Sequence, residues 1–250
     1  MLSPRERKRR RLRERPFPDT WRRVLQATSL YRRIPPHDQA KLLGHAQVLL
    51  AEKRFEGAGG LTVDDAMKVL VAGHAAVLLL HRPPTCFPKL FSIVIYPQTY
   101  AVEEAVVDEA RFVEEIDELR AGESWTRGAV VLSWSDVEAD LEGAVRNVVL
   151  HEFAHQLDAE DGATNGAPIL ADQELRQRWA RELTVAFDQL VAAVDSGHRP
   201  FIDAYGAQDP ADFFAVATEA FFLHPVQLRQ GRPSHHAILR DFYRQDPARW

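Results

Sequence analysis

The sequence has little that would set it apart from ordinary globular proteins of a reducing compartment. It contains one cysteine, Cys86, so no intrachain disulfide can form and no oxidising environment is required. Its longest apolar run, AAVLLL at 75–80, is far too short to cross a bilayer, and no stretch resembles the apolar region of a secretory signal. No internal repeat or low-complexity linker interrupts the chain. We therefore expect a soluble, cytoplasmic protein without a membrane span.

Charge is distributed unevenly along the 250 residues, of which 46% are hydrophobic and 27% charged. Residues 1–23 hold ten Lys/Arg and three Asp/Glu and carry +7, whereas the other 227 residues carry −12. The basic head 5-RERKRRRLRER-15 could contact nucleic acid, an acidic membrane surface or an acidic protein. No basic patch with interleaved aromatic residues recurs, so direct nucleic-acid binding is not expected. We expect residues 1–18 to form a solvated, disordered tail.

The order of the predicted elements indicates an α+β protein that is mainly helical. Helical spacing and capping residues predict helices first, β-branched runs then predict a small mixed β-sheet, and helices return afterwards. The predicted helices cover 19–34, 39–55, 66–81, 144–158, 173–194, 210–224 and 233–245, and the predicted strands cover 92–97 and 129–135. We expect an N-terminal helical lobe over 19–82 and a catalytic domain over 83–250, with a single domain over 19–250 as the alternative.

One segment, 146-RNVVLHEFAHQLDAEDG-162, places titratable side chains in an apolar region, where they are costly unless paired or bound to a metal. On a helix, His151 and His155 lie one turn apart and can point at one ion, while Glu152 is rotated by about 100° from His151. This His-Glu-x-x-His spacing suits zinc with an open position for water, and it makes Glu152 the candidate general base. Asp158 could accept the outer N–H of a ligating histidine. The alternative, an exposed helix with scattered polar residues, fits the apolar surroundings poorly.

A catalytic zinc site needs a third protein ligand, and 209-DPADFFAVATEAFFLHP-225 is the place to look for it. In this apolar helix, Asp212 and Glu219 are seven residues apart and only about 20° apart around the axis. Asp212 could instead be an acidic residue favoured by the helix dipole in the first turn, and Glu219 could pair with an arginine. Spacing alone leaves open which carboxylate reaches the metal.

The chain resembles the Mlc titration factor A family of zinc peptidases, whose catalytic domain is similar to that of the anthrax lethal factor. The matching segments cover most of the chain and are 50-LAEKRFEGAGGL-61, 128-GAVVLSWSDV-137, 149-VLHEFAHQLDAEDGATNGAP-168 and 205-YGAQDPADFFAVATEAFF-222. The long match around the zinc motif is far more specific than the five-residue pattern. The resemblance implies a zincin-type fold and one zinc ion per chain.

The resemblance also implies roles for individual residues. It places the zinc histidines at His151 and His155 and the general base at Glu152. The family's third ligand is a glutamate in an Ala-Glu-x-Phe-Ala pattern, which falls on Asp212 in 211-ADFFA-215. The aspartate is one methylene shorter, so either the helix must approach the metal more closely or the bond to the metal must lengthen. Glu219 remains a substitute ligand or a carboxylate that supports a ligand.

A tyrosine of the family that stabilises the developing oxyanion falls on Tyr205. The alternative for Tyr205 is a turn residue with its hydroxyl in water. The strand 129–134 resembles the edge strand on which zinc peptidases align an extended substrate, although it could equally be an interior strand.

The leading hypothesis is a zinc metallopeptidase that hydrolyses peptide bonds with a water activated by zinc and Glu152. The resemblance implies aminopeptidase-like activity on a peptide or protein substrate, and binding to a glucose-responsive transcriptional repressor. The competing hypothesis is a weakly catalytic or non-catalytic regulator that captures such a repressor. The replacement of the usual glutamate by Asp212 gives that second hypothesis some support.

Overall fold

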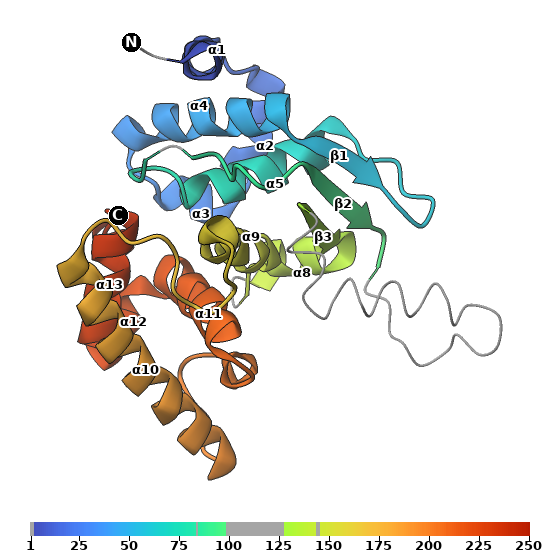
Figure 1. The fold of residues 1–250 in the computed structure, drawn as a ribbon. Coiled ribbons are helices and arrows are strands. Elements are labelled where there is room, and N and C mark those ends of the chain that lie inside the picture. The colour runs from blue at the N-terminus through green and yellow to red at the C-terminus, as the bar shows by residue number, and fades with distance from the viewer. Residues whose placement is uncertain (1–2, 84, 99–127, 144–145) are drawn as a thin grey trace.

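The computed structural model describes residues 3–83, 85–98, 128–143 and 146–250 (Figure 1). Helices dominate and three short strands form one sheet, so the expected α+β class is confirmed. The helices are α1 (Pro4–Arg13), α2 (Asp19–Gln26), α3 (Ser29–Arg33), α4 (Pro36–Glu52), α5 (Asp65–Val77), α8 (Trp134–Gly143), α9 (Val148–Asp158), α10 (Gln173–Asp195), α11 (Pro210–Leu223), α12 (Pro225–Gly231) and α13 (Pro233–Tyr243). The strands are β1 (Arg54–Gly57), β2 (Ser92–Tyr96) and β3 (Ala129–Ser133), and 3-10 turns occur at η2 (Ala159–Asp161), η3 (Ala204–Ala207) and η4 (Pro247–Arg249).

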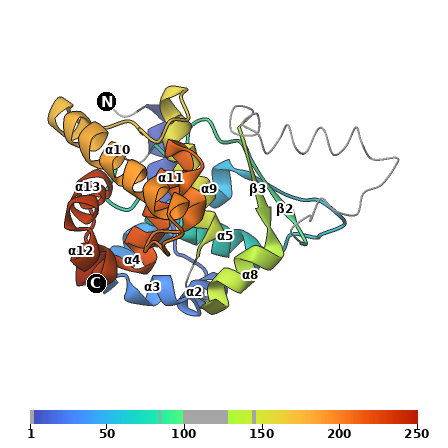
Figure 2. The ribbon, with the colours of Figure 1, turned by 90° about the horizontal axis from the view of Figure 1, so that it is seen from below.

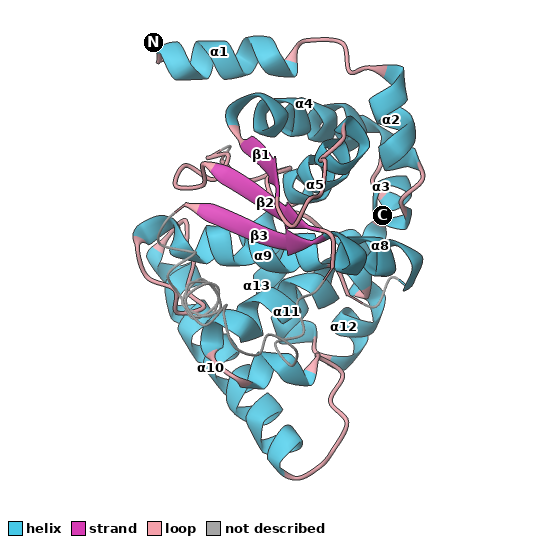
Figure 3. Ribbon diagram, turned by 90° about the vertical axis from the view of Figure 1, so that its right-hand side faces the viewer, coloured by secondary structure: helices cyan, strands magenta, loops and turns pink. Residues whose placement is uncertain are grey.

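The sheet has the order β1-β2-β3, and both pairings are parallel. The prediction of a mixed sheet is therefore wrong for the strands that the structure describes. Strand β1 was expected to be the end of a helix, because four residues are too few to show the alternation that marks a strand. Parallel neighbours need a crossover connection, and α5 provides it between β1 and β2. Figures 1 and 3 show β1 nearest to α4 and β3 nearest to α9.

Side-chain caps decide where several helices begin. Asn147 accepts the backbone N–H of Leu150, so α9 begins at Val148 and not at the predicted residue 144; residues 144–145 lie outside the described part of the chain. The predicted helix over 19–34 is divided, because Thr28 caps a new helix by accepting from Tyr31. Helix α8 follows β3 directly where a longer strand was expected.

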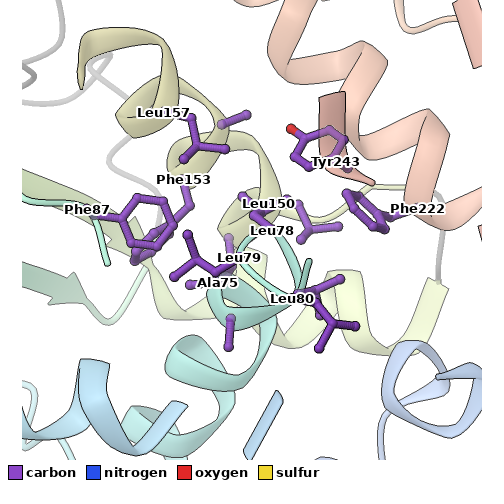
Figure 4. Packing of buried hydrophobic residues seen from close by; sticks show 14 of the residues in the cluster. Ala75, Leu78, Leu79, Leu80, Phe87, Leu150, Phe153, Leu157, Phe222 and Tyr243 are labelled. Atoms are coloured by element: carbon purple, nitrogen blue, oxygen red, sulfur yellow. The ribbon is translucent and has the colours of Figure 1, made fainter. Parts of the chain in front are cut away.

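Apolar side chains of α5 and α9 meet in the centre of the molecule (Figure 4). Phe153, inside the histidine motif, is fully buried and meets Phe87 edge-to-face at a ring distance of 4.9 Å. On the other side of α9, the ring of Phe222 on α11 meets the ring of Tyr243 on α13 edge-to-face, with the ring centroids 5.0 Å apart. Figure 2 shows α9 and α11 lying side by side, and the two helices pack directly on each other. Packing of α5 on α9 crosses the boundary expected near residue 83, and the division into 19–82 and 83–250 stays a prediction.

The basic head forms helix α1 over Pro4–Arg13, where a disordered tail over residues 1–18 was expected. Ser3 caps α1 by accepting from Glu6, and α1 packs on α4. Arg9 is only 4% exposed and is paired with Glu52 of α4. Composition alone could not reveal this partner, which lies 43 residues away in the chain. Among the helices of the described ranges, none is both long enough and apolar enough to span a bilayer.

Candidate metal centre

Helix α9 presents both histidines of the motif to the same point. The Nε2 atoms of His151 and His155 are 3.3 Å apart, and the two rings meet edge-to-face with centroids 5.0 Å apart. His155 is buried, and the side chain of His151 is 13% exposed. The expectation that one helical turn would bring the two imidazoles together agrees with this geometry.

Asp212 completes the cluster from the first turn of α11. Asp209 caps this helix by accepting from the backbone N–H groups of Ala211 and Asp212, which orients the turn. The Oδ1 atom of Asp212 lies 3.3 Å from His155 Nε2 and 4.0 Å from His151 Nε2.

These separations fit a metal ion. Ligand atoms about 2.0–2.2 Å from a tetrahedral zinc ion lie roughly 3.3–3.6 Å from one another. Two of the three separations match this range, and the third is slightly longer. Two imidazoles and a carboxylate are also the donor types that zinc prefers. Within the described part of the chain, His151, His155 and Asp212 form a group of three potential metal ligands. Their ligand atoms all lie within 4.8 Å of one another.

Glu219, the other candidate ligand, lies behind His151. Its Oε1 is 2.8 Å from His151 Nδ1, the ring nitrogen that faces away from Asp212, and its Oε2 accepts the backbone N–H of Asn147 at 2.6 Å. Both oxygens are therefore engaged by donors. In this arrangement Glu219 contacts the outer ring nitrogen of His151, and Asp212 is the carboxylate that faces the Nε2 atoms.

Asp158 does not take the place expected for it. Its Oδ2 accepts the backbone N–H of Gly166 at 2.7 Å, and the hydrogen bond to an outer histidine nitrogen comes from Glu219. Burial raises the pKa of Asp158 to about 6, against the opposing effect of the loop N–H groups. The interaction anchors a loop whose Gly166 packs closely against Pro210, at the start of the helix that carries Asp212. Spacing on a helix shows which side a residue faces, but not which neighbour lies there.

Glu152 and Tyr205 border the three side chains. Burial raises the pKa of Glu152 to about 7, with the carboxylates of Asp212 and Glu219 adding to the effect and His151 opposing it. Tyr205, on η3, is 43% exposed, and its ring lies 5.8 Å from the ring of His151. Burial and the nearby acidic groups raise the pKa of its phenol. Both residues thus lie beside His151 and Asp212, and their catalytic roles stay predictions.

The two histidines differ in their electrostatic surroundings. Burial lowers the pKa of His155, and the hydrogen bond to Asp212 opposes the effect only in part. Burial also acts to lower the pKa of His151, but the hydrogen bond to Glu219 and the charges of the nearby acidic groups outweigh it, so the pKa is raised. The acidic neighbours of His151 therefore favour its charged form, whereas the surroundings of His155 favour its neutral form.

Two residues at the centre had no assigned role in the sequence analysis. Asn147 lies at the N-terminus of α9, and its side-chain nitrogen is 2.9 Å from Nδ1 of the buried His74 on α5. An asparagine before an apolar helical run is a recognisable capping signal. No sequence signal connects His74 with it, because 73 residues separate the two.

Comparison with known proteins gives three findings. The family described as glucose-regulated metallo-peptidase M90 matches residues 4–244. An uncharacterized protein of Synechocystis sp. is 35% identical over 238 residues, which cover 94% of this chain and 86% of that protein. The Mlc titration factor A proteins of Yersinia enterocolitica and Yersinia pestis are 30% and 32% identical, covering 91% and 84% of this chain and 85% and 78% of those proteins.

Proposed function

This chain belongs to the glucose-regulated metallo-peptidase family M90, and we propose that it is a zinc-dependent peptidase whose metal is held by His151, His155 and Asp212. The observation that carries the proposal is the convergence of two imidazole nitrogens and one carboxylate oxygen at separations that suit zinc. Family membership supports a metallopeptidase activity, and the donor set supports zinc as the metal.

When bound, zinc would polarise the scissile carbonyl and lower the pKa of a water molecule. The protein's own residues perform the remaining tasks. Glu219 accepts a hydrogen bond from the Nδ1–H group of His151, which leaves Nε2 free as a ligand atom. Glu152 takes a proton from the attacking water and delivers it to the leaving amine, a task suited to a carboxylate whose pKa is about 7. Tyr205 donates a hydrogen bond to the oxyanion as it forms.

We further propose that the substrate is an extended peptide and that cleavage is aminopeptidase-like. Strand β3 is one of the two outer strands in the described sheet and packs beside α9, and Val131 on it is 37% exposed. An outer strand next to the centre could pair with a substrate backbone and align it. We place the protein in the cytoplasm, where peptides of this kind are accessible.

A second function, capture of a transcriptional repressor, is favoured by two observations. Relatives carry the name Mlc titration factor A, and this chain has Asp212 where the resembled family has glutamate. A weaker metal site would be tolerated if partner binding were the main task. In this alternative the protein is a regulator with little or no peptidase activity.

The two functions are separated by measuring zinc content and peptide cleavage in the same preparations. We expect the wild-type chain to contain one zinc ion and to cleave members of a peptide library. The variant Glu152→Gln should retain zinc and lose turnover by about 10²–10⁴-fold, because it lacks the proton-transfer group. The exposed Glu174→Gln on α10 is the matched control and should behave as wild type. Repressor capture by a wild-type protein that cleaves no peptide would favour the second function.

A further inference from the structure

Asn147 connects α9 to two other helices through three hydrogen bonds. Its Oδ1 accepts the backbone N–H of Leu150 at 2.9 Å, and its backbone N–H donates to Glu219 Oε2 on α11 at 2.6 Å. Its Nδ2 lies 2.9 Å from His74 Nδ1 on α5. Asn147, His74 and Glu219 are 4%, 3% and 7% exposed, so water does not compete for these bonds.

The directions of these bonds follow from the chemistry of the donors. A backbone N–H can only donate, so Asn147 must present its oxygen to Leu150 and its NH₂ group to His74. His74 therefore accepts through an unprotonated Nδ1 and is neutral. Burial lowers the pKa of His74 to about 4, which agrees with a neutral ring.

The same chain of bonds ends at the metal centre. Glu219 receives one N–H at each oxygen, from Asn147 at Oε2 and from His151 at Oε1. This pairing holds the carboxylate in one rotamer and requires the proton of His151 to sit on Nδ1. His151 Nε2 then offers its lone pair towards Asp212 and His155.

His74 reaches the rest of the molecule through one ring nitrogen. It lies on a buried helix among alanine, valine and leucine side chains, and its Nδ1 meets the side-chain nitrogen of Asn147 at 2.9 Å. Its Nε2 has no hydrogen-bond partner among the residues that the structure describes. The hydrogen bond with Asn147 is therefore the contact through which His74 can act on the metal centre.

We propose that His74 and Asn147 are positioning residues of the metal centre, which act through Glu219 to set the orientation and tautomer of His151. This inference rests on the proposed function, since it assigns the two residues to the zinc site. His74 fixes the amide plane of Asn147. Asn147 in turn sets both the start of α9 and the position of Glu219.

The test measures zinc affinity of the full-length, metal-free chain by competition with a chromogenic chelator. His74→Leu retains bulk but removes the acceptor, and we expect zinc binding to weaken by about 10-fold, the lower end of the range for residues that support a ligand. His74→Asn places an oxygen near the position of Nδ1 and should restore binding to within about 3-fold of wild type, a difference below that range. His45→Leu is the matched control. It replaces a histidine that is equally buried on α4 and has no hydrogen bond to this network.

Asn147→Ser provides a second, independent variant if His74→Leu does not fold. Serine retains a capping oxygen for α9 but has no NH₂ group for His74, so we again expect weaker zinc binding. Equal zinc binding by His74→Leu, Asn147→Ser and wild type would overturn the inference and leave the proposed function intact. His74→Asn binding as weakly as His74→Leu would also overturn it. A wild-type chain that binds no zinc would refute the proposed function itself.

Discussion

Arg9 of α1 donates two parallel hydrogen bonds to Glu52 of α4, from Nε to Oε1 at 2.9 Å and from Nη2 to Oε2 at 2.7 Å. The arginine is 4% exposed and the Glu52 side chain 11% exposed. The remaining nitrogen, Nη1, donates to the carbonyl of Thr85 at 3.2 Å. The N-terminal helix is thus attached to the loop that carries Phe87 against Phe153 of the histidine motif.

Arg9→Ala should lower the free energy of unfolding by about 3 kcal/mol, because it leaves Glu52 largely buried with only the more exposed Arg5 as partner. Arg10→Ala on the same helix is the matched control. Its ion pair with Glu14 is exposed on both sides and screened by solvent, so its loss of stability should be much smaller than that of Arg9→Ala. Urea unfolding of both variants gives the comparison. Equal losses would show that α1 does not pack on the protein in solution.

The same ion pair predicts a pH dependence. The hydrogen bond from Arg9 lowers the pKa of Glu52 from 4.5 to about 2. As the pH falls, the unfolded chain takes up this proton before the folded chain does, so the stabilisation present above about pH 4.5 is lost towards pH 2. The stability difference between wild type and Arg9→Ala should therefore be smaller at pH 3 than at pH 6. Urea unfolding at both pH values measures it, and an unchanged difference would contradict the assignment.

Gly166→Ala should lower the free energy of unfolding by more than the cost of placing an alanine at a positive φ angle. Gly166 has φ = 75°, and an added Cβ would collide with the carbonyl oxygen of Pro210. Gly197→Ala is the matched control, because its φ is 71° but nothing lies within 4 Å of an added Cβ. We expect a loss of about 1–2 kcal/mol for the control and at least 1 kcal/mol more for Gly166→Ala. Thermal unfolding measures both. Equal losses would mean that the loop is not pressed against α11.

The two carboxylates of α11 should respond differently to neutralisation. Asp212→Asn removes the proposed ligand and should cause the larger loss of zinc affinity. Glu219→Gln leaves one acceptor oxygen for two N–H donors, those of His151 and Asn147, and removes the negative charge, so it should weaken zinc binding by about 10–100-fold. Chelator competition measures both affinities. A larger loss for Glu219→Gln than for Asp212→Asn would reverse the roles assigned to them.

Much of the fold could be read from local patterns. The long helices α4, α5, α10 and α11 lie close to their predicted ranges, because many consecutive residues repeat the apolar spacing and capping residues mark their starts. Strands β2 and β3 also lie within their predicted ranges, but several other short elements were not predicted. Strand β1, helix α12 and the helical form of α1 have few residues to show a pattern, and for β1 and α1 it is neighbouring strands or helices that stabilise them.

For the site, the sequence alone determined which residues can share a side of one helix. His151 and His155 were paired by helical spacing, and Asp212 and Glu219 were placed on one side of α11 in the same way. The packing of α11 on α9 places Asp212 towards the Nε2 atoms and Glu219 behind His151. The packing of α5 on α9 likewise brings His74 to Asn147, 73 residues away in the chain. Such assignments depend on how separate helices cross, and the periodicity of a single helix contains no information about that crossing.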